Sequence, residues 1–375
     1  MGNIFPKRLM KIITFYLPQF HTFPENDKWW GEGFTEWVNV KSANPQYKNH
    51  YQPRIPLGNN YYDLTNCKTI RWQAEIAKKH GIYGFCFYHY WFNGKLLMQK
   101  PMEMFLNDVS INLNFCVCWA NETWTKAWAQ HSKKVLIEQT YGMEEEWDKH
   151  FNYLLPFFKD NRYICIDMKP MLVIYRPEQI LNLKDMLLFW EEKAKESGFN
   201  GMHFICQQSE YNCQNDEAGY LFKNYIEYQP DRAMKKQQIQ LPMLTKRLLN
   251  RISLKLGFKR TKYTTYTFNY DKIWECILKM DPDDSKAIPG AFVDWDNTPR
   301  YKERARIFDG YTPEKFEKYL EKQILHAKTA YKKDFIFMFA WNEWGEGGYL
   351  EPDEKFGYRA LEAVKKALIN TGEFI

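Results

Sequence analysis

The 375-residue sequence lacks several patterns that would assign it to common classes of protein. No run of 18 apolar residues occurs, so no transmembrane helix is predicted. The apolar run at residues 12–17 is too short for a secretion signal and has no small-residue cleavage site after it. Gly2 follows Met1, but Pro6 replaces the Ser or Thr of a myristoylation motif. We therefore expect a cytoplasmic protein.

The chain also lacks a C-x-x-C motif and a G-x-G-x-x-G loop. Five of its eight cysteines lie in apolar, strand-like runs, and Cys116 and Cys118 alternate as they would in a strand. This distribution predicts reduced, buried thiols rather than metal ligands. The missing glycine-rich loop argues against a doubly wound sheet that binds a nucleotide.

Net charge is modest and aromatic content is high. A formal charge of +6 does not by itself predict nucleic-acid binding, and no motif predicts a cofactor, a metal or an obligate protein partner. The 14 Trp and 25 Tyr residues each carry a polar group that needs a partner when buried. Their abundance favours amphipathic walls of the kind that suit sugar rings, and an aromatic-rich core is the alternative.

Eight short apolar runs, rich in β-branched and aromatic residues, recur along the chain. They do not alternate strictly between apolar and polar, which is typical of parallel strands buried on both faces. The runs are residues 12–17, 83–88, 115–119, 171–175, 202–207, 225–228, 288–293 and 335–341.

Amphipathic stretches of helical length separate many of these runs, at residues 67–80, 144–159, 184–197, 313–332 and 358–369. The fourth opens with Thr312 as N-cap and Pro313 at the first helical position. Repeated strand–helix alternation predicts an α/β protein, a (β/α)8 TIM barrel forming one domain over residues 1–375. A doubly wound open sheet is the runner-up.

Long connections follow the first and sixth predicted strands. Residues 18–66 are rich in Trp, Tyr, Pro and Asn, and such loops usually build the rim of a barrel active site. The basic insertion, residues 231–265, holds nine Lys or Arg between residues 235 and 262. Within it, residues 242–256 predict an amphipathic helix packed on the barrel. The alternative is peripheral docking on an anionic membrane surface or on a lipid-linked substrate.

Barrel enzymes carry their chemistry at the carboxyl ends of the strands. Polar and aromatic residues gather at every predicted strand end, and burying polar groups without partners is costly, so this bias predicts a pocket. The candidate substrate-binding residues are Tyr16, Gln19, His21, Trp30, Tyr88, His89, Trp91, Trp119, Asn121, Glu122, Tyr175, Arg176, Tyr228, Asp294, Asp296, Trp341, Asn342 and Trp344.

Glu343 and Glu346 are the candidate catalytic pair. They lie three residues apart after the last strand, so a turn there would aim both into one pocket and separate their pKa values. A structural role for both glutamates is the alternative. Glu122 could instead provide an acid across the pocket, or could pair with Arg176 or Lys126.

Two other groups of residues have competing interpretations. Asp294 and Asp296 form a D-x-D pattern, for which we favour contacts with sugar hydroxyls over metal binding. His21 and His89 are interpreted as substrate hydrogen-bonding residues, and a structural role is the alternative.

The motifs FYLPQFH, ENDKWWGEGFTEW, YGFCFYHYWFNGK, CWANETWT, DWDNTPR and WNEWGEGGYLEPD occur along the chain. Together they resemble the WbsX-type, glycoside hydrolase family 99-like proteins of bacterial surface-polysaccharide clusters. The resemblance extends from about residue 12 to about residue 367. The wider clan includes endo-α-mannosidases on (β/α)8 barrels, whose strand-eight motif is similar to residues 342–347.

The resemblance implies roles for the two glutamates. Glu343 would deprotonate the sugar 2-hydroxyl, which then attacks the anomeric carbon and gives a 1,2-anhydro sugar. Glu346 would be the acid/base at the leaving group. Gly345 departs from the mannosidases, which tend to carry His there, so mannose specificity does not carry over.

The sequence therefore predicts a carbohydrate-active enzyme that acts on an oligosaccharide or polysaccharide. The expected chemistry is that of a retaining glycosidase or transglycosylase acting on a bacterial surface polysaccharide, of O-antigen or capsule type. The alternative is a glycosyltransferase that adds a sugar to a lipid-linked intermediate.

Overall fold

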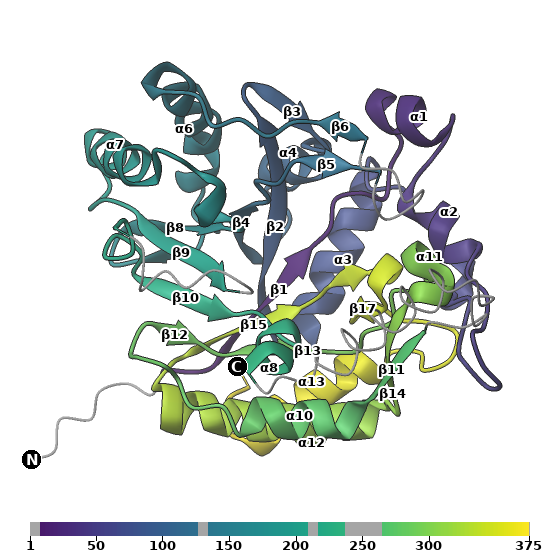
Figure 1. Cartoon of the computed structure of the whole chain (residues 1–375). Coiled ribbons are helices and arrows are strands. Elements are labelled where there is room, and N and C mark those ends of the chain that lie inside the picture. The colour runs from purple at the N-terminus through teal and green to yellow at the C-terminus, as the bar shows by residue number, and fades with distance from the viewer. Residues whose placement is uncertain (1–7, 127–133, 209–216, 237–264, 375) are drawn as a thin grey trace, which may run out of the picture.

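The computed structural model describes residues 8–126, 134–208, 217–236 and 265–374, and its centre is a parallel sheet (Figure 1). Neighbouring strands follow the order β12–β10–β9–β8–β4–β2–β1–β15–β13. The strands are β1 (Lys11–Tyr16), β2 (Ile82–Phe92), β4 (Asn114–Trp119), β8 (Lys169–Ile174), β9 (His203–Gln208), β10 (Asn224–Glu227), β12 (Ala287–Ile288), β13 (Gly290–Phe292) and β15 (Phe335–Phe339). Each pairing along this path is parallel.

The sheet closes on itself through Pro289, which separates β12 from β13. β12 pairs with β10 and β13 pairs with β15, so one chain segment joins both ends of the path. Proline has no N–H to donate to a strand ladder, which accounts for the break. The predicted (β/α)8 barrel is confirmed, and the open doubly wound alternative is wrong.

Successive side chains of a barrel strand point alternately inward and outward. On β1, Phe15 stacks on Tyr88 inside the barrel with a ring-centroid distance of 5.4 Å. Its neighbour Tyr16 faces the outside and donates a hydrogen bond to Gln73 of the helix α3 (Cys67–Lys79) at 2.6 Å. Both residues are buried, which explains why the strand runs read as continuously apolar.

The main helices lie around the sheet (Figure 1). Besides α3 they are α4 (Lys100–Asn107), α6 (Glu144–Phe158), α7 (Leu183–Glu196), α8 (Asp231–Lys236), α10 (Tyr270–Leu278), α12 (Pro313–His326) and α13 (Arg359–Asn370). Thr312 caps α12 as predicted, accepting a hydrogen bond from the N–H of Lys315 at 3.3 Å. The predicted helix at 313–332 ends earlier, at His326, where a single π-helical turn, η5 (Ala327–Tyr331), replaces its last residues.

The long loop after β1 contains helices α1 (Pro24–Trp30) and α2 (Glu36–Lys41) and the 3-10 turn η1 (Leu57–Asn59). Trp37 of α2 anchors it, donating its indole N–H to the carbonyl of Tyr62 at 2.8 Å. In the basic insertion, α8 forms its first turns, and the predicted helix at 242–256 lies outside the described residues.

Short elements complete the structure. They are β3 (Lys95–Leu97), β5 (Trp124–Thr125), β6 (Val135–Ile137), β7 (Cys165–Ile166), β11 (Tyr266–Asn269), β14 (Arg306–Asp309), β16 (Asn342–Glu343), β17 (Gly348–Tyr349), α11 (Thr298–Tyr301), η2 (Pro177–Gln179), η4 (Lys302–Arg304) and η6 (Trp344–Glu346).

The cysteines are free in the described parts of the chain, and four of them are buried in the barrel strands: Cys86, Cys116, Cys118 and Cys206. The expectation of burial is wrong for Cys67 and Cys165, which are exposed at the start of α3 and in β7. Cys213 lies outside the described residues. No helix in the described ranges is long and apolar enough to cross a membrane.

Candidate active site

A cavity of about 460 Å³ opens at the carboxyl ends of the barrel strands. Its volume lies within the range of roughly 300–1,000 Å³ that is usual for small-molecule sites. The predicted site residues that line it are Gln19, Trp30, Tyr88, Glu122, Tyr175, Tyr228, Glu343 and Glu346.

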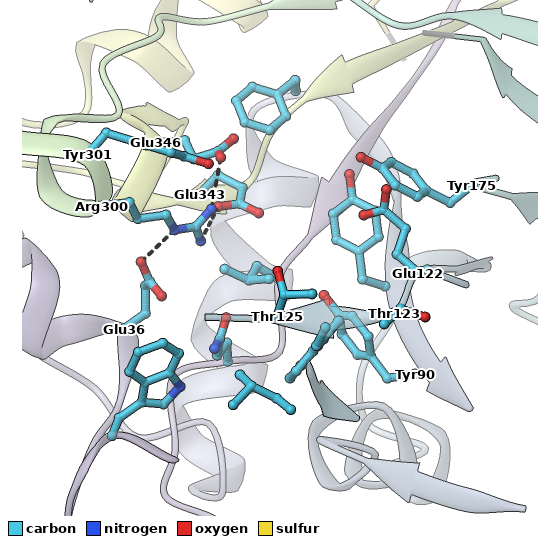
Figure 2. A pocket seen from close by; sticks show the side chains of 18 of the residues that line it. Glu36, Tyr90, Glu122, Thr123, Thr125, Tyr175, Arg300, Tyr301, Glu343 and Glu346 are labelled. Atoms are coloured by element: carbon cyan, nitrogen blue, oxygen red, sulfur yellow. Dashed lines mark hydrogen bonds and ion pairs between the residues drawn. The ribbon is translucent and has the colours of Figure 1, made fainter. Parts of the chain in front are cut away.

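The chain after β15 brings the two glutamates to this cavity. β16 ends at Glu343 and pairs antiparallel with β17, and the intervening residues form the 3-10 turn η6. Glu343 at the end of β16 and Glu346 at the end of η6 face the same side, because both carboxyl groups contact Arg300. Figure 2 shows both carboxyl groups beside Arg300.

Arg300 of α11 bridges three carboxyl groups. Its Nη2 lies 3.1 Å from Glu343 Oε2 and its Nη1 lies 2.9 Å from Glu346 Oε1. Its Nε lies 2.8 Å from Oε1 of Glu36 in α2. One guanidinium therefore faces three acids, and full ionisation would leave this cluster with net negative charge.

Burial raises the pKa of Glu343 to about 8, against the opposing attraction of Arg300 and with support from the charges of Glu346 and Glu36. Burial also raises the pKa of Glu346, again opposed by Arg300. At neutral pH the pair therefore retains a proton, so one carboxyl group can donate and the other can accept. This division is what acid–base chemistry at a glycosidic bond requires.

The opposite wall of the cavity is aromatic and polar. Figure 2 shows Tyr90, Glu122, Thr125 and Tyr175 across the open space from the glutamate pair. Further lining residues are Leu17, Trp30, Tyr88, Ala120, Trp124, Leu136, Tyr228, Tyr301 and Phe339. Aromatic faces with interspersed hydroxyl groups match a sugar ring, which has apolar faces and a polar rim.

Glu122 lines the cavity and also pairs with Arg176, whose Nε donates to Glu122 Oε1 at 2.7 Å. Asn121 fixes that corner, because its side chain exchanges two hydrogen bonds of 2.8 Å with the backbone of Arg176. Asn121 and Arg176 are thus outside the cavity lining and shape its edge.

Trp341, Asn342, Trp344 and Tyr16 are not brought to the cavity. The first and third donate their indole N–H groups to the buried carboxyl of Glu351, at 3.1 and 2.7 Å. Asn342 binds both the N–H and the carbonyl of Leu17, at 2.8 and 3.0 Å. The hydrogen bonds of Trp341, Asn342 and Trp344 hold the segment that carries Glu343 and Glu346 in place.

His89, Trp91 and Trp119 also lie away from the cavity. His89 Nε2 is 2.9 Å from Nε2 of His150 on α6. Trp91 stacks on the His150 imidazole with a ring-centroid distance of 4.6 Å. Trp119 donates its indole N–H to the carbonyl of Trp91 at 3.2 Å. His21 is buried, which lowers its pKa. The contacts of His89 match its structural alternative, and His21 is not among the residues that line the cavity.

The D-x-D carboxylates are occupied by protein donors. Asp294 Oδ2 lies 2.7 Å from Nη2 of Arg54, and Asp296 Oδ2 lies 2.8 Å from His50 Nε2 and 2.6 Å from Gln52 Nε2. Both aspartates are buried and neither lines the cavity. These contacts connect the loop after β1 to the residues that follow β13.

Sequence reasoning missed Glu36, Arg300 and Tyr301 as cavity residues. Glu36 and Arg300 do lie in the motifs GFTEW and DWDNTPR, on which the family resemblance depends. The residues directly after each strand do not include Glu36 or Arg300, because these two belong to helices α2 and α11 within the connecting loops.

The described chain is a (β/α)8 barrel with paired acids in an aromatic cavity at its carboxyl-terminal face, where barrel enzymes carry their active sites. The fold is shared with solved structures. The GH99 endo-α-mannosidase from Bacteroides thetaiotaomicron is 12% identical, with a TM-score of 0.54 over 96% of this chain and 97% of that one. A glycoside hydrolase-like protein is also 12% identical, with a TM-score of 0.58 over 98% of this chain and 97% of that one.

The family model described as "Glycosyltransferase WbsX" matches residues 12–364. The chain therefore belongs to the WbsX family. An uncharacterized protein, WxcX, from Xanthomonas campestris pv. campestris strain B100 is 32% identical over 363 residues, which cover 95% of this chain and 49% of that protein. The protein of the same name from strain ATCC 33913 gives the same identity and coverage. The chain thus spans about half the length of the curated relatives it matches.

Proposed function

We propose that this protein is a retaining glycosidase or transglycosylase that acts on a bacterial surface polysaccharide of O-antigen or capsule type. The observation that carries the proposal is the pair Glu343 and Glu346, which share Arg300 in an aromatic cavity and both have raised pKa values. The mannosidases of the same fold provide the chemical precedent, and the polysaccharide substrate follows from the resemblance to WbsX-type proteins.

In this mechanism one glutamate removes the proton of the sugar 2-hydroxyl, and that oxygen attacks the anomeric carbon. The bond to the leaving oxygen breaks as the other glutamate protonates it, which gives a 1,2-anhydro sugar. Water, or a sugar hydroxyl in transglycosylation, then attacks the anomeric carbon and opens the three-membered ring. It gives its proton to the glutamate that protonated the leaving oxygen, and the other glutamate returns its proton to the 2-oxygen. Both displacements invert the anomeric carbon, so the configuration is retained.

The resemblance assigns the base to Glu343 and the acid to Glu346. In the substrate-free protein, however, Glu343 has a pKa of about 8 and therefore holds a proton at neutral pH. Arg300 contacts both carboxyl groups, so a proton moving from one acid to the other leaves the guanidinium paired in either state. We propose that the substrate 2-hydroxyl, on approaching Glu343, shifts the proton to Glu346.

Activated substrates test these roles. A glycoside with a 4-nitrophenolate leaving group needs no general acid for the first displacement, so Glu346→Gln should retain most of the nitrophenolate release in the first turnover and lose activity on an ordinary oligosaccharide. Glu343→Gln should lose activity on both. The opposite pattern would exchange the two roles, and full activity of both variants on both substrates would refute the site.

A glycosyltransferase is the second candidate, favoured by the family description "Glycosyltransferase WbsX". The test supplies nucleotide sugars together with a lipid-linked acceptor. Net transfer to the acceptor without hydrolysis of any glycan would establish this alternative. Hydrolysis or glycan-to-glycan transfer without a nucleotide sugar would support the first proposal.

A further inference from the structure

Glu36 is a third acid at the site, brought there from the long loop after β1. It is fully buried on α2, yet it lines the cavity beside Arg300. Its Oε1 accepts the hydrogen bond from Arg300 Nε at 2.8 Å. Its Oε2 has no hydrogen-bond partner within the described ranges of the chain. A buried acid placed so close to two others raises their free energy of ionisation, so its presence calls for an explanation.

Gly345 provides the space that this arrangement needs. A Cβ atom at position 345 would lie 2.0 Å from Glu36 Oε1 and 2.8 Å from Arg300 Nε, both far inside van der Waals contact. Any side chain there would force Glu36 and Arg300 to move. The glycine between Glu343 and Glu346 therefore lets α2 approach the turn that carries both acids.

We propose that Glu36 is a positioning residue, which holds the Arg300 guanidinium across Glu343 and Glu346 and adds a further negative charge beside that pair. This inference rests on the proposed roles of Glu343 and Glu346. The contact of Glu36 with Nε restrains the guanidinium further than the two Nη contacts alone do. The added charge favours retention of a proton on the pair.

Charged and titratable groups from several packed elements surround the Glu343–Glu346 pair. Glu343 faces Arg300, Glu346 and Glu36. Glu346 faces Arg300, Glu36, Arg306 and Asp231. The tyrosines nearby are Tyr88, Tyr90, Tyr175, Tyr228 and Tyr301.

The test measures protonation directly. Protein labelled with ¹³C at the glutamate side-chain carboxyl is titrated by NMR, and the Glu343 signal is identified by its absence in Glu343→Gln. In Glu36→Gln the titration midpoint of Glu343 should fall by about one pH unit, because a nearby like charge is removed and the hydrogen-bond acceptor is kept. Glu36→Asp restores the charge and should return the midpoint most of the way. The matched control is Glu32→Gln, an exposed residue of the same loop, which should leave the midpoint unchanged.

A double-mutant cycle tests the role of Gly345. Gly345→Ala should lower the thermal midpoint of the protein, whereas adding it to Glu36→Ala should cost little more, because the space is already vacated. Additive losses would overturn the role of Gly345. An unchanged Glu343 midpoint in Glu36→Gln would overturn the proposed effect of the Glu36 charge on the pair. Neither measurement needs a substrate, so absence of glycosidase activity would refute the proposed function while leaving this result standing.

Discussion

Replacement of Arg300 by Gln should make the stability of the protein strongly dependent on pH. The guanidinium contacts Glu36, Glu343 and Glu346 at 2.8–3.1 Å and is largely buried, with 14% of its side chain exposed. Removing one partner of a buried ion pair typically costs about 3–5 kcal/mol, because the remaining charge loses its compensation. Here three acids lose the same partner, so we expect a cost in the upper part of that range at pH 8.

The cost should shrink in acid. Without Arg300, the pKa of Glu343 rises further above about 8, since Arg300 is the group that lowers it. A carboxyl group whose pKa is raised by folding contributes stability below its unfolded pKa, near 4.5, and loses that contribution as pH rises through the folded value. At pH 5 the pair is largely protonated in the variant, so we expect a loss of roughly 1–2 kcal/mol there.

Thermal midpoints at pH 5 and pH 8 provide the measurement, since the chain is too long to assume two-state unfolding. The variant should melt several degrees below the wild type at pH 8 and close to it at pH 5. Arg71→Gln, which breaks the exposed ion pair with Asp108, should lower the midpoint little and equally at both pH values. A loss in the Arg300 variant that is equal at pH 5 and pH 8 would refute the reasoning.

Three further predictions concern the glutamate pair and the Arg54–Asp294 ion pair. Glu343→Gln and Glu346→Gln should each reduce kcat on an unactivated oligosaccharide by roughly 10²–10⁴-fold. The assay measures sugar release, and circular dichroism verifies that both variants are folded like the wild type. A loss below tenfold in both variants would contradict the proposed chemistry. Wild-type kcat/KM should fall as pH rises through about 8, because the Glu343–Glu346 pair loses there the proton that the acid must donate; a profile flat to pH 10 would contradict this role of the pair. Arg54→Met should cost about 3–5 kcal/mol by leaving buried Asp294 uncompensated, read as a lower thermal midpoint at pH 7; an unchanged midpoint would show that this pair is not structural.

The barrel could be predicted because its strands are buried on both faces, and that burial appears directly as repeated apolar runs. All eight runs correspond to observed strands, with the seventh interrupted by Pro289. Helix ends were also predictable where local chemistry decides them, as at Thr312. Loop paths were not, because they depend on contacts between segments hundreds of residues apart, such as Glu36 with Arg300.

The same limit explains the excess of predicted site residues. Side chains at a strand end alternate between the cavity and the surrounding helices, and sequence does not say which of two polar neighbours points inward. Tyr88 reaches the cavity, whereas the next residue, His89, turns outward to His150. Trp341 and Trp344 are predicted as substrate-binding residues. Nothing in the sequence indicates that Glu351 accepts hydrogen bonds from both of their indole N–H groups.

Glu351 determines what could be transplanted from this protein into another barrel. Its carboxyl group, with a pKa raised by burial to about 7, accepts hydrogen bonds from Tyr62, Gln73, Trp341 and Trp344. These residues belong to the first loop, the first barrel helix and the turn that carries the acids. An engineer who grafted residues 341–346 alone would leave two indole N–H groups buried without acceptors. The smallest set of residues that could be transferred therefore includes Glu351 and its hydrogen-bond partners. A designed barrel without them should position Glu343 and Glu346 less precisely.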